Sequence, residues 1–202
     1  STFVTHLFDG HLVALIRACG HEVLALEKRH LGTDSHHDAV GANCFPINWS
    51  IDSAATKNLV LGRVFDWLVV DHYSLDIKWE TALRDHARKI LVIDDLANRR
   101  HSCNLVLDQN LGRKLNDYDG LLDVGTEILL GPHYALLRPE FAQNRDRSLA
   151  RRGTNRMFDF LVCMGGVDQE NITGRILKTL DNIVMPAETR IRVVLGASSP
   201  WI

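Results

Sequence analysis

The stretch WLVVDHYSLDIKWETALRDHARKILVIDD, residues 67–95, decides the fold of this 202-residue chain. Its first five residues, 67–71, form a short apolar run that ends in Asp71, as is typical of a buried parallel strand. A helical pattern follows over 75–87, and a second apolar run covers 89–94. Strand, helix and strand in this order predict an α/β protein with a parallel sheet covered by helices.

The same alternation continues on both sides of this stretch. Apolar runs predict further strands at residues 22–27, 104–108, 127–131, 158–164 and 190–196. Apolar stripes predict further helices at residues 11–20, 52–63 and 172–183. No strand is predicted before the first helix, so the first sheet is expected to lack its opening strand.

Three segments follow from this pattern. Residues 1–141 are expected to form an N-terminal Rossmann-like domain that is incomplete at its start. Residues 142–157, which are polar and rich in arginine, are expected to form a linker. Residues 158–202 then restart the strand and helix pattern, as the truncated beginning of a second domain.

Composition limits the classes of function. The formal net charge of −2 provides no bulk field for a polyanion, so no nucleic-acid partner is expected. The four scattered cysteines form no CxxC pair, which argues against a structural zinc and favours reduced core thiols. No apolar run reaches the roughly 20 residues of a membrane helix, and the first residues do not resemble a signal peptide, so the expected location is cytoplasmic. No metal or cofactor is expected.

Polar residues directly after the first strand of the quoted stretch are candidate site residues, because ligands bind at the carboxyl ends of parallel strands. Asp71 can orient a ligand or accept a proton, and Tyr73 can donate to a ligand oxygen. His72 titrates near neutrality. The alternative is that Asp71 binds loop amides while His72 and Tyr73 pack at the rim.

Two aspartates, Asp94 and Asp95, follow the next strand, and Arg99 lies close behind them. Neighbouring residues on an extended segment point to opposite sides, so the pair is not expected to share one ligand. Arg99 can meet an anionic group or the two aspartates. Hydrogen bonding within the loop is the favoured alternative.

A glycine turn follows the strand at 158–164, in the segment GGVDQENIT at 165–173. Gly165 and Gly166 let the backbone approach a ligand, and the amides at the start of the following helix suit a diphosphate. Against this, Asp168 can itself cap the helix.

Four segments, in this order and spacing, carry a resemblance to a known family: DHYSLDIKWE (71–80), ILVIDDLANRRHSCNLVLDQN (90–110), LLGPHYALLRPEF (129–141) and GGVDQENIT (165–173). Together they resemble the UDP-2,4-diacetamido-2,4,6-trideoxy-β-L-altropyranose hydrolase family of pseudaminic acid biosynthesis. The resemblance implies the GT-B architecture of two Rossmann-like domains, similar to the glycosyltransferase that builds the peptidoglycan lipid precursor. It also implies a UDP-linked amino sugar as substrate, cleaved by water at the anomeric carbon without a metal.

The resemblance carries roles to particular residues. It implies that Tyr73, in the family's DxY segment, lies near the sugar and the attacking water, with Asp71 in support. It implies substrate-binding roles for eight further residues, Asp94, Asp95, Arg99, Gly165, Gly166, Asp168, Asn171 and Thr173. In the family's loop IDDLAxR this chain has Asn98 in place of the usual aspartate.

The family's catalytic histidine has no assigned match. It lies in a GxGHxxR loop after the first strand, and neither strand nor loop is predicted here. His11 has only the GH of that motif and lacks its arginine, so it receives no role. The chain is therefore expected to be a fragment of a nucleotide-sugar hydrolase. A GT-B glycosyltransferase and a non-catalytic sugar-nucleotide-binding module are the alternatives.

Overall fold

The computed structural model describes residues 1–8, 11–27, 47–152, 159–196 and 199–202. These residues form two compact units, Ser1–Leu136 and Leu137–Ile202, and each is described by itself below.

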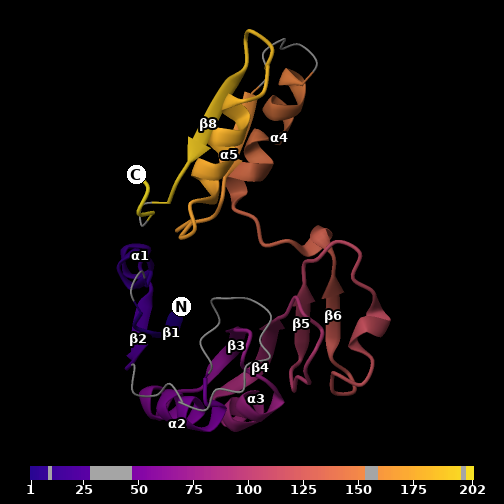
Figure 1. Ribbon diagram of the computed structural model, residues 1–202. Coiled ribbons are helices and arrows are strands. Elements are labelled where there is room, and N and C mark those ends of the chain that lie inside the picture. The colour runs from indigo at the N-terminus through magenta and orange to yellow at the C-terminus, as the bar shows by residue number, and fades with distance from the viewer. Residues whose placement is uncertain (9–10, 28–46, 153–158, 197–198) are drawn as a thin grey trace. The chain divides into compact units, whose positions relative to one another are not determined.

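A four-stranded parallel sheet is the centre of the first unit (Figure 1). Its strands are β3 (Phe65–Asp71), β4 (Ala87–Ile93), β5 (Leu105–Asp108) and β6 (Glu127–Leu130), and they lie side by side in chain order. All three strand pairs are parallel, so the four carboxyl ends share one edge of the sheet. The predicted α/β class and parallel pairing are confirmed.

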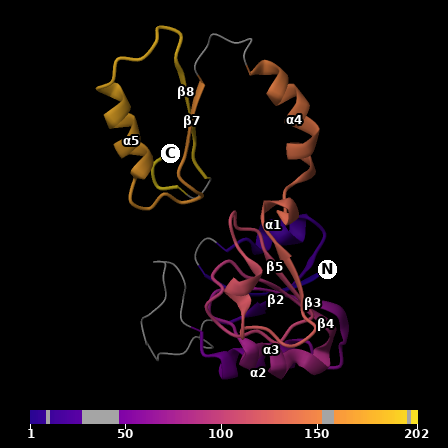
Figure 2. The same cartoon turned by 90° about the vertical axis from the view of Figure 1, so that its right-hand side faces the viewer.

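Helices α2 (Trp49–Leu59) and α3 (Ile77–Leu83) lie side by side in this unit (Figure 2). Each begins at a side-chain cap, because the first amides of a helix have no partner within it. Asn48 Oδ1 accepts from the amides of Ser50 and Ile51, and Asp76 Oδ1 accepts from that of Lys78. A turn of 3-10 helix, η2 (Arg84–His86), leads from α3 into β4.

The core lies between α3 and one face of the sheet. Its buried members are Val70, Leu75, Trp79, Leu83, Ile90, Val92, Cys103, Val106 and Tyr118. On β3, Val70 is 4% exposed while its neighbour Val69 is 55% exposed, as strand alternation requires. The core thus fixes the strands from one side and leaves their carboxyl ends available.

The expected absence of a first strand is wrong. Thr2–His6 form a strand, β1, that pairs in parallel with β2 (Glu22–Leu26), and helix α1 (Val13–Ala18) connects the two. The segment TFVTH has few large apolar residues, which hid it from a search for apolar runs. Its aromatic and β-branched side chains nevertheless favour an extended backbone.

Buried hydrogen bonds connect β1 to the helices. His6 Nε2 lies 2.7 Å from Asp52 Oδ2, and the other carboxylate oxygen of Asp52 accepts a 2.6 Å hydrogen bond from Trp79 Nε1. Because these three residues come from β1, α2 and α3, one aspartate holds three elements together.

The second unit contains a strand, helix and strand. Strands β7 (Asp159–Cys163) and β8 (Arg190–Val194) pair in parallel, with α5 (Ile172–Asp181) between them in the chain. Helix α4 (Pro139–Arg151) precedes β7 and occupies most of the segment expected to be a linker. The helix begins with Pro139 at its first position, has Glu140 in its first turn and ends on Arg151, all of which favour a helix.

The cysteines only partly fit the expectation of core thiols. Cys103 is buried, and burial raises the pKa of its thiol to about 12. Cys19 and Cys163 are exposed, so the expectation is wrong for them. Cys44 lies outside the described residues. No described helix has the length and apolar character needed to cross a membrane.

Candidate functional site

A pocket of about 230 Å³ lies at the carboxyl ends of β3, β4 and β5. It is lined by Asp71, His72, Tyr73, Ile93, Asp94, Asp95, Gln109 and Asn110. The structure therefore brings together the candidates after β3 with the two aspartates after β4. Its lining offers mainly carboxylate and amide oxygens, which accept hydrogen bonds from the hydroxyl and amide N–H groups of a ligand.

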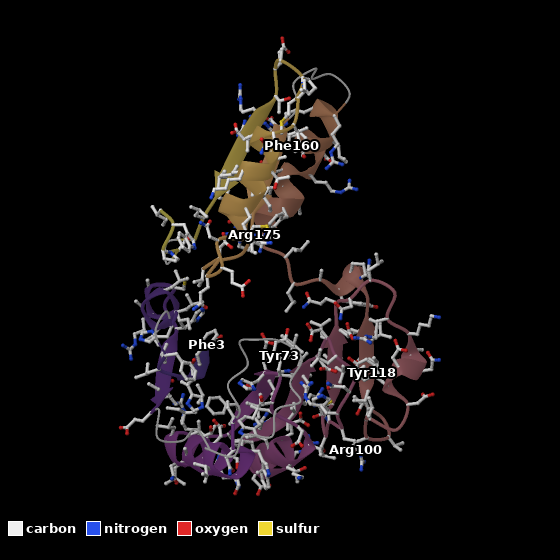
Figure 3. The ribbon with its side chains drawn as sticks, viewed as in Figure 1. Phe3, Tyr73, Arg100, Tyr118, Phe160 and Arg175 are labelled. Carbon is white, nitrogen blue, oxygen red and sulfur yellow. The ribbon has the colours of Figure 1, made fainter. Side chains whose placement is uncertain are left out.

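Tyr73, labelled in Figure 3, lies two residues after the end of β3 and lines the pocket. Its side chain is 55% exposed, and its hydroxyl donates a 3.0 Å hydrogen bond to Asp95 Oδ2. The bond joins the loop after β3 to the loop after β4. A phenol in this position can exchange its carboxylate partner for a ligand oxygen.

His72 is half-buried beside Tyr73. Its Nδ1 accepts a 3.0 Å hydrogen bond from the Ser74 amide. Burial, together with nearby His6 and Arg99, lowers the pKa of His72, although the carboxylates of Asp52 and Asp71 oppose the shift. The imidazole is thus neutral at pH 7, and it lines the pocket as an uncharged polar group.

The adjacent aspartates have different surroundings. The Asp94 side chain is fully buried, and it accepts hydrogen bonds from the Ala97 amide at 2.9 Å and from Arg99 and Tyr118 at 3.0 Å each. Asp95 is exposed and faces Tyr73. Both carboxylates line the pocket, and whether they share one ligand stays a prediction.

Burial by itself raises the pKa of Asp94, but its partners overcome that effect. The Arg99 guanidinium, the Ala97 amide, His101 and the Tyr118 hydroxyl together hold the pKa of this carboxyl below its ordinary value. Asp94 is therefore an ionised anchor beneath the pocket at neutral pH.

Arg99 connects two loops. Its Nε donates to Leu75 O at 2.8 Å, its Nη2 to His72 O at 3.2 Å, and its Nη1 to Asp94 Oδ1 at 3.0 Å. All three of these hydrogen bonds go to oxygens of the protein itself, and Arg99 does not line the pocket. Asn98, at the position where the family has aspartate, accepts a 3.3 Å hydrogen bond from Arg99 through its side-chain oxygen.

Two pocket residues, Gln109 and Asn110, were not assigned to the site from the sequence. Asn110 Nδ2 donates to Asp95 O at 2.8 Å, and Gln109 Oε1 accepts from the Leu136 amide at 2.6 Å. Both follow directly after β5, as Asp71 and Asp94 end or follow their strands. The sequence shows this strand-end pattern at Asp108, Gln109 and Asn110, but hydrogen bonding within the loop was the favoured interpretation there.

His11 lies between β1 and α1, the place that the family's histidine loop occupies after the first strand. Its side chain is exposed, and its Nδ1 accepts a long, 3.4 Å hydrogen bond from the Val13 amide. Because β1 is present, a missing first strand is no longer a reason to leave His11 without a role. The arginine of the family motif is still absent.

In the second unit, the glycine turn follows β7 as predicted, with Gly165 at φ +83°. Asp168 and Asn171 both have left-handed backbones and cap α5. The Asp168 carboxylate accepts from the amides of Ile172 at 2.8 Å and Thr173 at 2.9 Å, and Asn171 Oδ1 accepts from that of Gly174 at 2.9 Å. Thr173 is buried behind this cap. The first amides of the helix are therefore occupied by the protein's own side chains.

Gly196 after β8 is expected to be essential for packing in the second unit, because a Cβ at this position would clash with the Gly166 carbonyl oxygen. We predict that Gly196→Ala lowers the free energy of unfolding of this unit by about 1–3 kcal/mol, as overpacking does. Urea unfolding measures the change. Gly166→Ala is the matched control, since its Cβ would meet no described atom within 4 Å. Equal stability of the two variants would contradict the prediction.

Comparison with known proteins shows which proteins this chain resembles. No family model matches the chain. Over 144 residues, 71% of this chain, the sequence is 32% identical to the UDP-2,4-diacetamido-2,4,6-trideoxy-β-L-altropyranose hydrolase of Campylobacter jejuni, and the match covers 48% of that protein. Over 133 residues, 65% of this chain, it is 23% identical to an uncharacterized protein of Methanocaldococcus jannaschii, covering 27% of that protein.

The chain thus spans about half the length of the curated hydrolase that it matches. The extent of the match agrees with a resemblance carried by long motifs spread along the sequence. The comparison supports that resemblance: the chain is similar to the UDP-2,4-diacetamido-2,4,6-trideoxy-β-L-altropyranose hydrolase of Campylobacter jejuni.

Proposed function

We propose that the protein is a nucleotide-sugar hydrolase that releases a diacetamido-trideoxy sugar from UDP, in pseudaminic acid or related surface-polysaccharide biosynthesis. The observation that carries the proposal is the pocket at the ends of β3, β4 and β5, formed by two of the motifs shared with the family. The name of the Campylobacter jejuni relative supports the same reaction.

In the proposed reaction, a water oxygen attacks the anomeric carbon of the sugar. The bond between that carbon and the diphosphate oxygen breaks, and UDP leaves with the electron pair. A base takes a proton from the attacking water, and His11 is our candidate because it lies in the loop after β1. The Tyr73 hydroxyl and the Asp95 carboxylate would orient the sugar and the water at the pocket.

Gly165 and Gly166, which follow β7 in the second unit, keep the substrate-binding role that the resemblance implies. Because side chains already occupy the first amides of α5, the proposal gives the ligand the amides of the glycine turn itself. In this scheme Asp168, Asn171 and Thr173 shape the turn and Arg99 and Asp94 shape the pocket. Asp71 lines the pocket in support of Tyr73.

The test is UDP release from the UDP-linked altropyranose sugar by the intact protein that carries this chain, with metal or with a chelator. The proposal expects release in both conditions without any added acceptor. An intact protein that releases no UDP in either condition would rule the proposal out.

Two other functions predict different results in the same assay. A GT-B glycosyltransferase would release UDP only when an acceptor alcohol is supplied. A non-catalytic sugar-nucleotide-binding module would show calorimetric binding of the UDP-sugar without turnover.

Tyr73→Phe is expected to lower turnover about tenfold or more, because it removes the hydroxyl that faces the pocket. Stability should change by only about 1 kcal/mol or less, since the lost hydrogen bond is solvent-exposed. Steady-state UDP release and thermal unfolding measure the two effects. Tyr134→Phe, which changes an exposed tyrosine outside the pocket, is the control. Unchanged turnover in Tyr73→Phe would remove this residue from the site.

A further inference from the structure

Five buried polar side chains lie behind the pocket, and we call them the pocket floor: Glu80, Asp94, His101, Asp108 and Tyr118. All are between 0% and 3% exposed. Only Asp94 also lines the pocket. Burying charged groups is unfavourable unless each is met by partners, so this group requires an explanation beyond packing.

Tyr118 stands at the centre of the pocket floor. It ends the short 3-10 helix η3 (Leu115–Tyr118), and its hydroxyl lies 3.0 Å from Asp94 Oδ2 and 3.0 Å from Asp108 Oδ2. Figure 3 shows its place on the β5 and β6 side of the first unit. A phenol has one proton, so it donates to one carboxylate at a time. The hydroxyl therefore separates two buried carboxylates that would otherwise repel each other directly.

Two arginines balance these carboxylates from the outer sides, and a histidine lies beside them. Arg99 Nη1 pairs with Asp94 Oδ1 at 3.0 Å, and Arg113 Nε pairs with Asp108 Oδ2. His101 Nε2 lies 4.0 Å from Asp94 Oδ2, and its Nδ1 is 2.6 Å from Glu80 Oε1. On the side of η3 itself, Asp117 lies 3.8 Å from Arg113. With Asp94 and Asp108, these are the described charged groups around the Tyr118 hydroxyl.

Both carboxylates stand at the base of a pocket loop. Asp95 directly follows Asp94, and Asn110 lies two residues after Asp108. The Asp108 Oδ1 accepts from the Asn110 amide at 2.9 Å, and Asn110 Nδ2 donates to Asp95 O at 2.8 Å. The distance between the Asp94 and Asp108 carboxylates thus determines the positions of Asp95 and Asn110, which line the pocket.

We propose that Tyr118 is a positioning residue of the pocket, whose hydroxyl spaces Asp94 from Asp108 and thereby places Asp95 and Asn110. The kinetic consequence rests on the proposed function, whereas the structural consequence does not. Tyr118 itself does not touch the pocket and acts only through the two aspartates.

The structural test compares Tyr118→Phe with Tyr134→Phe by backbone amide NMR of the chain. Tyr118→Phe removes only the spacing hydroxyl, so the Asp95 and Asn110 amide signals should shift, while Tyr134→Phe should leave them in place. Unmoved Asp95 and Asn110 signals in a folded Tyr118→Phe variant would overturn the proposal.

A rescue variant separates spacing from packing. Replacing Asp108 by asparagine removes the repulsion that the lost hydroxyl had screened, so Tyr118→Phe should be less destabilising in the Asp108→Asn background than in the wild type. Thermal unfolding of the four members of this double-mutant cycle measures the coupling. If Tyr118→Phe alone does not fold, the readout is whether the Tyr118→Phe, Asp108→Asn double variant folds, as the spacer role requires. Additive effects, or a double variant that is equally unfolded, would show that the hydroxyl does not act as a spacer.

The kinetic test uses the intact protein. Tyr118→Phe should lower kcat about tenfold and leave KM within about twofold, because the groups that orient the reactants are displaced. A wild-type protein without UDP release refutes the proposed function and leaves NMR to decide on Tyr118. An active wild type with the same kcat as Tyr118→Phe refutes the positioning role, and so does a loss that appears in KM instead of kcat.

Discussion

Glu80→Ala is expected to lower the free energy of unfolding of the first unit by about 2–5 kcal/mol, because it removes the acceptor of two hydrogen bonds at a fully buried position. The Glu80 and His101 side chains are both 0% exposed and lie 2.6 Å apart. The other oxygen of Glu80 accepts a 2.6 Å hydrogen bond from the Ser102 amide. Alanine would leave both donors buried without their acceptor, and urea unfolding would measure the loss.

Two further variants make this result interpretable. Glu80→Gln keeps an oxygen for one donor and should lose less stability than Glu80→Ala. Glu127→Ala, at an exposed position of β6 in the same unit, controls for the loss of a carboxylate and should change stability by about 0.5 kcal/mol or less. A Glu80→Ala variant that unfolds within 1 kcal/mol of this control would contradict the buried-pair account.

The sheet of the first unit was predictable because each of its strands contains a short apolar run in the sequence. Strands β3 to β6 each place residues in or against the core, so Val, Ile and Leu are frequent in them. Strand β1 escaped because its only large apolar residues are Phe3 and Val4, both partly exposed. A strand whose residues are partly exposed needs no apolar run, so a search for hydrophobic periodicity does not find it.

The candidate site was predictable as a location but not as a set of contacts. Strand-end polar residues predicted that Asp71, Tyr73 and Asp95 would lie at one edge of the sheet. Sequence patterns could not show that the Arg99 guanidinium donates its hydrogen bonds to Leu75, His72 and Asp94. That outcome depends on a loop conformation fixed by contacts between residues distant in the chain.

The pocket floor was missed for a related reason. His101 and Tyr118 lie in segments of mixed composition, where nothing in the sequence marks them as buried. Their burial follows from pairing with Glu80 in α3 and with Asp94 and Asp108 at two strand ends. Polar residues that become buried only through such partners are invisible to hydrophobic patterns.

His11→Asn is expected to lower turnover of the intact protein by about 10²- to 10⁴-fold, the usual contribution of a general base. Its position after β1 matches the place of the family's histidine loop. The competing explanation is that His11 only caps α1 through the 3.4 Å contact of its Nδ1 with the Val13 amide. Asparagine can accept the same hydrogen bond, so the variant should keep stability within about 1 kcal/mol of the wild type.

Two other histidines sharpen the test. His21→Asn changes a residue between α1 and β2, away from the carboxyl end of β1, and should retain wild-type turnover. His6→Asn should act mainly on stability, because His6 is 8% exposed and its Nε2 is paired with Asp52 at 2.7 Å. Turnover is therefore compared per folded molecule, by UDP release at a temperature below unfolding. If His11→Asn turns over as fast as His21→Asn, His11 is a helix cap and the base lies elsewhere. Loss confined to His11→Asn would instead make the loop after β1 part of the active site.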